Sequence, residues 1–319
     1  MAKLNVGVVG TGYFGKFHAE KYTQIPEANL VGVVDINQER AQEVATKNQT
    51  QAFFDPAQLY EKVEAVSIAV PTPLHYSVAS QFLKRRIHVL LEKPITSKVR
   101  EAKKLIERAH AKNLILQVGH LERFNPALTP LQPALLNPRF IESHRLRSFI
   151  ERAIDVDVVM DLMIHDIDII LSLVKAEVKE IRATGVPVIS EHADIANARI
   201  AFKNGCVANV TASRVSLKSM RKIRIFQPDA YFSIDLAQRK VSIHRKEPAP
   251  PGSFFPRITQ ENFSPPEYDA LQAEVHAFVN SVITKTPPLV TGMDGLKALE
   301  VAREIHKQIG AQGNVGSNF

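Results

Sequence analysis

The sequence is poor in cysteine and has no long hydrophobic run, and both absences limit what the chain can be. Cys206 is the only cysteine among 319 residues, so no disulfide can form within the chain, as is usual in a reducing cytoplasm. No stretch approaches the roughly 18 uncharged apolar residues of a membrane-spanning helix. The N-terminus enters a strand-like segment without the basic and apolar regions of a signal peptide. We therefore expect a cytoplasmic protein with no membrane partner.

Motifs for metals and nucleic acids are also missing. No group of cysteine and histidine residues has the spacing of a metal site, so we expect no metal. The formal net charge is +7, but the densest basic patch, between Arg214 and Arg224, has no interleaved aromatic residue and matches no nucleic-acid-binding motif. We interpret this patch mainly as a solvated face. Attraction of an anionic cofactor or substrate is the alternative.

The first 35 residues, by contrast, follow the pattern of a dinucleotide-binding unit. The apolar run Leu4–Val9 leads into Gly-Thr-Gly-Tyr-Phe-Gly at residues 10–15, and a helical pattern follows. The glycines suit a tight strand-to-helix turn whose backbone approaches a pyrophosphate at the helix N-terminus. A second apolar run ends in Asp35, twenty residues after Gly15, where a carboxylate can accept the adenosine ribose hydroxyls. An ordinary turn is the simpler alternative, but the whole series in this order predicts an NAD site.

Asp35 also predicts a preference for NAD over NADP. A carboxylate repels a 2′-phosphate, and the neighbouring Ile36 has no charge to attract one. Arg40 can still reach the adenine edge or a phosphate, which weakens this preference. The cofactor-binding residues predicted in this segment are Gly10, Gly12, Tyr13, Phe14, Gly15, Asp35 and Arg40.

Strand-like and helix-like segments alternate through the first 121 residues. The apolar runs are continuous, as expected for parallel strands that helices cover on both faces. We therefore predict a doubly wound Rossmann domain over residues 1–121. Beyond the first two strands, its expected strands are 52–54, 65–70, 87–91 and 114–118, and its later helices are 38–48, 56–60, 74–85 and 98–112.

The pattern changes after residue 121. A helical pattern at Val158–Val174 precedes strands that alternate in polarity, with Asn-Gly as a hairpin turn between Ile195–Phe202 and Val207–Ser213. Six prolines indicate a loop at Glu247–Pro266. We predict an α+β domain over residues 122–319 with an open, mostly antiparallel sheet, whose last helix packs back toward the first domain. Its other elements are the strands Ile223–Gln227, Tyr231–Asp235 and Lys240–Arg245 and the helices Tyr268–Thr284 and Gly295–Ile309.

Two segments with candidate chemical groups follow parallel strands, where doubly wound domains bind their ligands. Residues 70–75 contain two prolines around Thr72 and end in His75, although prolines can simply end a strand and start a helix. Glu92-Lys93-Pro94 follows the next strand and places Lys93 on the nicotinamide side. A lone lysine there is more often a solvated charge. These segments add the predicted cofactor-binding residues Pro71, Thr72, His75, Glu92 and Lys93.

A third segment lies in the helical pattern of the second domain. Asp161, His165 and Asp168 are spaced to form one polar stripe beside an apolar face. An exposed helix side is the alternative, but the stripe is acidic and has no lysine four residues on to pair with it. We therefore favour a site. The other ligands that a metal ion would need are not evident.

Together these motifs resemble the glucose-fructose oxidoreductase, inositol dehydrogenase and MocA (Gfo/Idh/MocA) family over essentially the whole chain. The closing segment, residues 291–300, is similar as well. The resemblance implies that Lys93, Asp161 and His165 are catalytic, that the Lys93–Pro94 peptide is cis, and that the antiparallel sheet forms a homodimer or homotetramer. One departure is Met163, which stands where many members carry a small residue beside the nicotinamide.

The implied reaction is oxidation of a secondary alcohol, in which a base takes the hydroxyl proton as hydride leaves for NAD. A neutral imidazole at His165 is suited to this, and a neighbouring carboxylate can fix its tautomer. A lysine ammonium at Lys93 can stabilise the developing alkoxide, or the amine can act as the base if its pKa is depressed. Both assignments stay open.

Within the family, residues 119–126 and 157–166 resemble a branch that oxidises C3 of UDP-N-acetylglucosamine for a partner aminotransferase in lipid A synthesis. Guanidinium groups can hold the diphosphate of such a nucleotide sugar, although most of these arginines would be surface charges. Among the arginines of this half, Arg123 and Arg145 are the predicted substrate-binding residues, together with Asp161 and His165. Further candidates are Arg147 and Arg152.

Three other functions compete with this expectation. One is a dehydrogenase of a free polyol or hexose, such as inositol or glucose. Another is a cofactor-binding regulator without catalysis, which intact Lys93 and His165 disfavour. The third is a reductase of carbon–nitrogen or carbon–carbon double bonds, similar to biliverdin reductase or dihydrodipicolinate reductase. Those enzymes share the first domain but lack the combination of the lysine with Asp-x-x-x-His.

Overall fold

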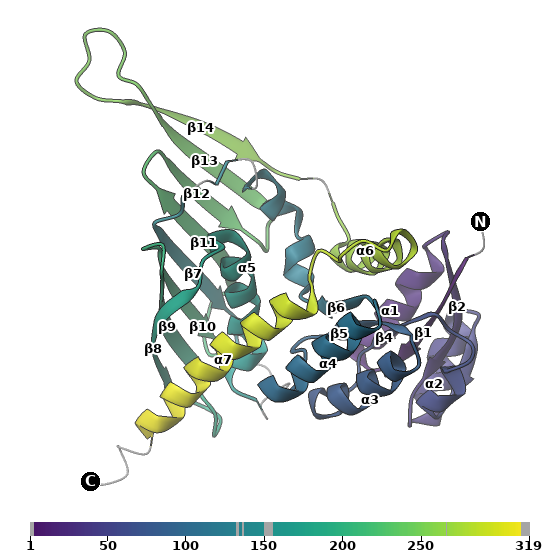
Figure 1. The fold of residues 1–319 in the computed structure, drawn as a ribbon. Coiled ribbons are helices and arrows are strands. Elements are labelled where there is room, and N and C mark those ends of the chain that lie inside the picture. The colour runs from purple at the N-terminus through teal and green to yellow at the C-terminus, as the bar shows by residue number, and fades with distance from the viewer. Residues whose placement is uncertain (1–2, 132–133, 136, 150–155, 266, 314–319) are drawn as a thin grey trace. The chain divides into compact units, whose positions relative to one another are not determined.

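The computed structural model describes residues 3–131, 134–135, 137–149, 156–265 and 267–313 (Figure 1). The chain forms two compact units, each built from two segments. The first joins Met1–Phe124 with Asp269–Leu299, and the second joins Asn125–Tyr268 with Glu300–Phe319. The sequence predicted one boundary, after residue 121. The structure instead returns residues 269–299 to the first unit.

The first unit is built on a six-stranded parallel sheet with the order β3-β2-β1-β4-β5-β6. This is the strand order of the dinucleotide-binding doubly wound fold, so the predicted Rossmann class is confirmed. Its strands are β1 (Leu4–Val9), β2 (Ala28–Val34), β3 (Gln51–Phe53), β4 (Ala65–Ile68), β5 (His88–Glu92) and β6 (Leu116–Gly119). Its helices include α1 (Tyr13–Thr23), α2 (Gln38–Lys47), α3 (Thr72–Lys84), α4 (Val99–Ala111), α6 (Ala270–Thr284) and the short η1 (Pro56–Leu59) and η2 (Leu121–Phe124).

The local sequence explains these strands well. Every strand predicted within the first 121 residues is present, and the predicted ends differ from the observed ones by at most two residues. All four residues of β4 are buried, as expected for a central strand covered on both faces. The continuous apolar runs therefore identified the sheet because no face of these strands needs to meet water.

Helix α6 comes from late in the chain but belongs to the core of the first unit. Its residues Val275, Phe278, Val279 and Val282 follow helical spacing along one face. They are buried in the same cluster as Tyr22 of α1. At roughly 25 cal/mol per Å² of apolar surface, burial of this face holds α6 in the unit. Figure 1 shows α6 lying beside α1.

The second unit contains an eight-stranded sheet with the order β14-β13-β12-β11-β7-β10-β9-β8. All neighbours are antiparallel except β7 and β10, which are parallel, so the predicted open, mostly antiparallel sheet is confirmed. The Asn-Gly hairpin joins β9 and β10 as predicted, with Gly205 at a positive φ of 83°. The strands are β7 (Phe140–Leu146), β8 (Val178–Val186), β9 (Ile195–Phe202), β10 (Val207–Ser213), β11 (Met220–Gln227), β12 (Ala230–Asp235), β13 (Lys240–Glu247) and β14 (Arg257–Phe263).

Two segments of this unit differ from expectation, one in kind and one in detail. The first is the proline-rich stretch expected to be a loop. It contains the edge strand β14, because all six prolines lie outside Arg257–Phe263 and leave its backbone free to pair with β13. The second is only a matter of helix type: the helix expected at Val158–Val174 is present over that range, but its first part is the π-helix η4 (Val159–Met163), and the α-helix α5 (Ile164–Val174) follows. Single π turns are frequent at functional sites.

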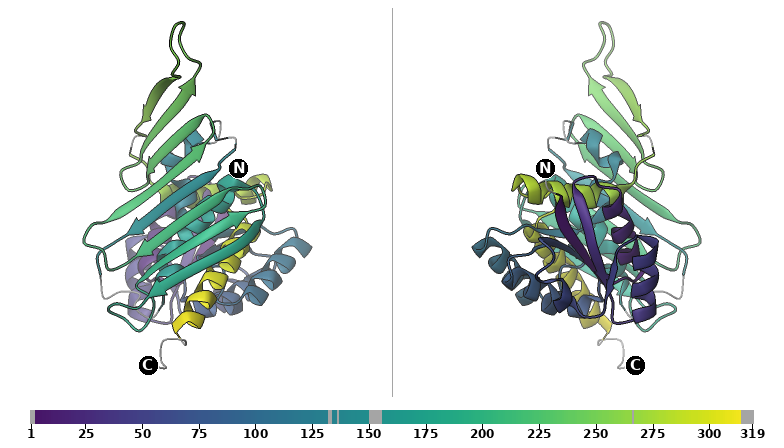
Figure 2. Two further views of the ribbon diagram at one scale, coloured as in Figure 1. Left: turned by 90° about the vertical axis from the view of Figure 1, so that its left-hand side faces the viewer. Right: turned by 90° about the vertical axis from the view of Figure 1, so that its right-hand side faces the viewer.

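Helix α5 packs against β7 and β10 on one face of this sheet. The left view of Figure 2 shows the other face, in front of which no described helix of this unit lies. The last helix, α7 (Gly292–Gly313), begins in the first unit, and its later part hydrogen-bonds β8 through Gln308. Among the described residues, no helix combines the length and apolarity needed to cross a lipid bilayer.

Candidate functional site

The turn between β1 and α1 requires glycine for steric reasons. Gly10 has a positive φ of 89°, and a Cβ on Gly15 would lie 1.7 Å from the Gly10 carbonyl oxygen. A Cβ on Gly12 would instead meet no described atom within 4 Å. Gly12 is also the N-cap of α1, so the first amide groups of this helix point past an open backbone. The turn therefore fits the pyrophosphate of a dinucleotide.

Asp35, at the end of β2, is held by several donors. Its carboxylate accepts hydrogen bonds from the Thr11 amide at 2.8 Å and the Thr11 hydroxyl at 2.9 Å. The Asn37 amide and the guanidinium of Arg40 donate as well, with the shortest Arg40 contact at 2.7 Å. Burial alone would raise the pKa of Asp35, but the hydrogen bonds from Arg40, Asn37 and Thr11 outweigh it and lower the pKa. Asp35 is thus a fixed carboxylate where the adenosine ribose is expected.

His75 links the two loops that follow β4 and β5. Its Nδ1 lies 2.9 Å from the carbonyl oxygen of Pro94, and its Nε2 lies 2.9 Å from that of Val70. Burial lowers the pKa of His75, which favours the neutral ring. The side chain is buried, and its two backbone neighbours, Val70 and Pro94, are adjacent in the chain to the predicted cofactor-binding residues Pro71 and Lys93. A direct contact of His75 with the cofactor stays a prediction.

The Lys93–Pro94 peptide is cis, as the resemblance implied. Lys93 follows β5, and its backbone amide donates to the Glu92 carboxylate at 3.3 Å. The other carboxyl oxygen, Oε1, lies 2.9 Å from Nε2 of His18 on α1. The Glu92 side chain is engaged within the protein, so the cofactor contact predicted for Glu92 would be made by its backbone.

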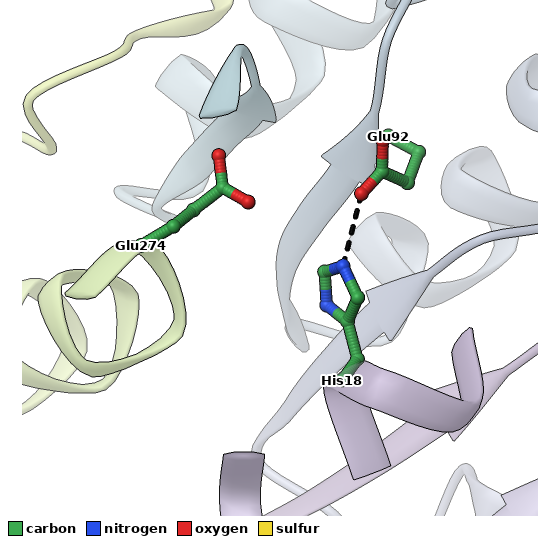
Figure 3. Close-up of side chains that lie close together, drawn as sticks. All are labelled: His18, Glu92 and Glu274. Carbon is green, nitrogen blue, oxygen red and sulfur yellow. Dashed lines mark hydrogen bonds and ion pairs between the residues drawn. The ribbon is translucent and has the colours of Figure 1, made fainter. Parts of the chain in front are cut away.

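Glu274 of α6 faces this His18–Glu92 pair, as Figure 3 shows. One ligand atom from each of the three residues lies within 4.8 Å of the others, the only such cluster among the described residues that is close enough to share a metal ion. His18 and Glu92 already contact each other directly, so we assign no metal here. Sequence analysis missed His18 and Glu274, although an acidic residue on the apolar face of α6 was a visible signal.

In the second unit, Asp157 organises the start of the helix that carries the candidate catalytic residues. Its carboxylate accepts hydrogen bonds from the amides of Val159 at 2.8 Å and Met160 at 2.9 Å. The His306 side chain of α7 contacts the same carboxylate. Asp157 therefore caps η4, where a negative charge also suits the helix dipole.

Asp161 and His165 lie at the junction of η4 and α5 and are both partly exposed. Arg147, just after β7, donates to Asp161 at 2.6 Å. The next acidic residue of the predicted stripe, Asp168, is buried at 2% exposure. The stripe is therefore not an exposed helix side. The partly exposed edge of this helix fits a site.

Arg145 is buried and forms a two-point contact with Asp166 of α5, with both N···O distances at 2.9 Å. This pair ties α5 to β7, so the guanidinium is already engaged within the protein. Arg123 donates to the Leu289 carbonyl oxygen at 3.5 Å in the first unit. Arg152 lies outside the described residues. The substrate role predicted for Arg123 and Arg145 stays a prediction.

The basic patch at residues 214–224 is not uniformly solvated. Arg214 is 1% exposed and donates to the buried Asp194 at 2.8 Å. Burial alone would raise the pKa of Asp194, but backbone amides and Arg214 lower it strongly. Lys218, Arg221 and Arg224 are exposed, as expected. Arg214 was misjudged because its partner lies 20 residues earlier in the chain.

The predicted site residues thus fall into two groups. The first unit holds Lys93, Arg123 and all predicted cofactor-binding residues. The second holds Asp161, His165 and Arg145. Within the first unit, hydrogen bonds link Asp35 with Arg40, and His75 with the loop of Lys93. That Lys93 and His165 act on the same substrate stays a prediction.

Similarity to known proteins extends over the whole chain. Residues 4–120 match a model described as an oxidoreductase family with an NAD-binding Rossmann fold, and residues 134–230 match a GFO/IDH/MocA C-terminal domain. The UDP-N-acetylglucosamine 3-dehydrogenase of Acidithiobacillus ferrooxidans is 39% identical over 313 residues, which cover 98% of this chain and 99% of that protein.

Solved structures agree with this similarity. A structure of the Acidithiobacillus ferrooxidans dehydrogenase superposes with a TM-score of 0.92 at 38% identity, covering 98% of this chain and 99% of that one. The myo-inositol 2-dehydrogenase of Thermotoga maritima is more distant, at 26% identity over 317 residues that cover 93% of each chain.

Proposed function

Because the chain belongs to the Gfo/Idh/MocA family of NAD-binding oxidoreductases, we propose that it oxidises a secondary hydroxyl of a nucleotide sugar, with C3 of UDP-N-acetylglucosamine as the first choice. The observation that carries this proposal is the 39% identity, over nearly the full length of both chains, to an enzyme named for that reaction. In this proposal the first unit binds NAD and the second binds the sugar.

The residues present fit the cofactor and the reaction. The open backbone at Gly12 suits the pyrophosphate, and bound NAD would accept a hydride from the sugar carbon. The hydroxyl proton must leave at the same time, so the products are a ketone, NADH and a proton. We assign this proton to His165 or Lys93, with the other group polarising the same oxygen. Arg147 holds Asp161 near the same end of the helix as His165.

The structure sharpens the choice of arginines for the diphosphate. Arg145 is buried and bound to Asp166, so releasing it would leave a buried carboxylate without its partner. Arg123 is partly exposed and donates to the Leu289 carbonyl oxygen at 3.5 Å, so its guanidinium is more accessible to a phosphate than that of Arg145. We therefore rank Arg123 above Arg145 as a diphosphate ligand.

A substrate panel tests this function. The enzyme is incubated with NAD and with UDP-sugars, free hexoses and inositols in parallel, while NADH absorbance is followed. An aminotransferase or another ketone trap is included, because formation of the ketone is unfavourable. We expect turnover of UDP-N-acetylglucosamine. Turnover of inositol or glucose with none on any UDP-sugar would overturn the proposal and favour the function of the Thermotoga maritima relative.

The proposed preference for NAD over NADP rests on the ionised Asp35. Its partner Arg40 is half-exposed, and a 2′-phosphate could compete with Asp35 for this guanidinium. Fluorescence titration with NADH and NADPH tests the preference. Tighter binding of NADPH would contradict it.

A place in the cell and a set of partners follow from the same proposal. A 3-keto nucleotide sugar is a substrate for an aminotransferase, so such an enzyme is the proposed partner, in a route toward lipid A in the cytoplasm.

We further propose a homodimer or homotetramer through the uncovered sheet face. An aromatic ladder of Phe140, Phe226, Tyr231 and His244 crosses four strands there, with ring centroids 4.8–5.8 Å apart. Sedimentation analysis of the wild type and Phe226→Ser tests this assembly.

A further inference from the structure

The loop that carries Lys93 rests on a buried polar cluster that the proposed reaction does not use directly. Glu92 lies on β5, His18 on α1 and Glu274 on α6, all within the first unit (Figure 3). Glycine at residue 119 leaves room for the Glu92 carboxylate, because a Cβ there would make a tight contact at 3.1 Å with Glu92 Oε2. The cluster is therefore built into the packing of β5, β6, α1 and α6.

The hydrogen bonds on the His18 side form one consistent chain. Tyr22 Oη lies 2.7 Å from Ser67 Oγ, and Ser67 Oγ lies 3.1 Å from His18 Nδ1. Burial raises the pKa of Tyr22, so its hydroxyl keeps its proton and can donate to Ser67. With Tyr22 as the donor, Ser67 can donate to Nδ1, and the other ring nitrogen, Nε2, can then donate to Glu92 at 2.9 Å. In this arrangement each of the three hydrogen bonds has one donor and one acceptor.

The two carboxyl groups differ sharply in their donors. Glu92 accepts from His18 and from the amide of Lys93. Glu274 is fully buried, and neither of its carboxyl oxygens has a hydrogen-bond partner among the described residues. Two carboxylates so close together in a buried site do not both ionise, and the one with hydrogen-bond donors keeps the charge. Burial, and to a lesser degree the charge of Glu92, raises the pKa of Glu274 well above its usual value.

None of the described elements that pack around Glu274 is seen to place a positive charge against its carboxyl group. Helix α1 presents His18 and Tyr22, and strand β5 presents Glu92. Strand β6 presents the uncharged Gln117, which donates to the backbone oxygen of Glu274. The η2 turn, which also packs on α6, carries Glu122 and Arg123, and Lys21 of α1 pairs with Asp269.

We propose that Glu274 is a neutral carboxylic acid and that its neutrality keeps Glu92 ionised next to Lys93, so that His18, Glu92 and Glu274 act as a buried support for this lysine. The part of this proposal that concerns support of Lys93 rests on the proposed function, because it takes Lys93 as catalytic. Glu92 is a positioning residue: its carboxylate accepts a hydrogen bond from the Lys93 amide at 3.3 Å and carries a negative charge on the residue next to Lys93 in the chain. Glu274 acts through Glu92.

The protonation of Glu274 can be tested without any substrate. Infrared spectra at pH 7 of the wild type, Glu274→Gln and the matched control Glu43→Gln, an exposed residue of α2, are compared. We expect a protonated carboxyl band that disappears only in Glu274→Gln. Absence of this band, or a bound metal ion that is stoichiometric in the wild type and lost in Glu274→Gln, would overturn the proposal.

Stability provides a second readout. Because the pKa of Glu274 is raised on folding, its stabilising contribution is complete below the unfolded pKa and is lost as pH rises through the folded pKa. The Tm of Glu274→Gln relative to that of the wild type should therefore rise as pH increases above about 4.5. The rise should be roughly 3–5 °C for each pH unit between the pKa of Glu274 in the unfolded chain and its pKa in the folded protein. Glu43→Gln should run parallel to the wild type. A constant Tm difference for Glu274→Gln from pH 5 to 8 would overturn the proposal.

The role of Glu92 needs kinetics. Removing its charge by Glu92→Gln lowers the pKa of a neighbouring lysine, so whichever limb of the pH–rate profile Lys93 controls should move to lower pH by about one unit. NAD affinity should not change. A fall in kcat without any shift of the profile would reduce Glu92 to a structural role. If no substrate is turned over, the proposed function fails, while the infrared and Tm results still decide the state of Glu274.

Discussion

The two units hold their functional groups in place by different means. In the first unit, backbone geometry does most of this: glycines shape the turn before α1, and the His75 ring lies between two backbone carbonyl oxygens, to one of which it donates. In the second unit, ion pairs of side chains do so, with Arg147 on Asp161 and Arg145 on Asp166. The glycine turn, which its backbone holds in place, should therefore be sensitive to added volume. The helix that ion pairs hold in the second unit should be sensitive to loss of charge.

The largest expected effect is a loss of kcat when the candidate catalytic side chain of either unit is replaced. Lys93→Met from the first unit and His165→Asn from the second should each reduce kcat by roughly 10²–10⁴-fold, because each removes a group that acts on the transferring proton or oxygen. NAD affinity, measured by fluorescence titration, should be nearly unchanged in both. Near-normal kcat in both variants would mean that the site has been misplaced. Loss of NAD binding in Lys93→Met would assign that lysine to the cofactor instead.

The next largest expected effect is a loss of stability when a buried ion pair of the second unit is broken. Arg145→Met should lower the free energy of unfolding by about 3–5 kcal/mol, because the buried Asp166 loses its two-point partner. Urea unfolding measures this. Replacing both residues, as Arg145→Met with Asp166→Leu, should restore most of the loss.

A matched control for this variant lies on the same sheet. Arg224 pairs with Glu142 at 3.4 Å, and both side chains are largely solvated. Arg224→Met should therefore change the unfolding free energy by about 0–1 kcal/mol. Equal losses in Arg145→Met and Arg224→Met would contradict the view that burial makes the first pair important.

The first unit should respond to volume instead. Gly15→Ala places a methyl group 1.7 Å from the Gly10 carbonyl oxygen, so the turn must shift, at a cost of about 1–3 kcal/mol. Gly12→Ala meets no described atom, so its stability should stay within about 1 kcal/mol of the wild type. Both variants should bind NAD more weakly, the second because its methyl group faces the pyrophosphate. Unchanged NAD affinity in Gly12→Ala would contradict the assigned cofactor position.

The same contrast explains which features could be predicted from sequence. The strands of the first unit follow from local apolar runs, and the glycine turn from a short motif, so both were found. Strand β7 was missed because it pairs with β10, more than 60 residues later, and because the turn signal Asn137-Pro138 just before it was overlooked. Strand β14 was hidden by the prolines on both sides of it.

The site residues divide in a similar way. Lys93, Asp161 and His165 carry recognisable motifs. The contacts that position them join residues far apart, as with His18 and Glu92, separated by 74 positions, or Arg145 and Asp166, separated by 21. No periodicity encodes such pairs. A π turn is equally invisible, because one added residue per turn barely changes an apolar pattern. Glu274 is the exception, since a carboxylate on the apolar face of α6 was readable and was overlooked.

The smallest expected effect on stability tests whether ion pairs in the second unit serve only the fold. Arg147 and Asp161 are partly exposed, at 25% and 18% of their side chains, so Arg147→Met should lower the unfolding free energy by only about 1 kcal/mol. If the pair orients Asp161 for catalysis, kcat should nevertheless fall by about tenfold, while Arg147→Lys, which keeps the charge, should recover part of it. Steady-state kinetics and urea unfolding of the two variants measure this. A stability loss as large as that of Arg145→Met, with kcat unaffected, would make Arg147 a structural residue and remove the distinction drawn here between pairs that hold the fold and a pair that holds the site.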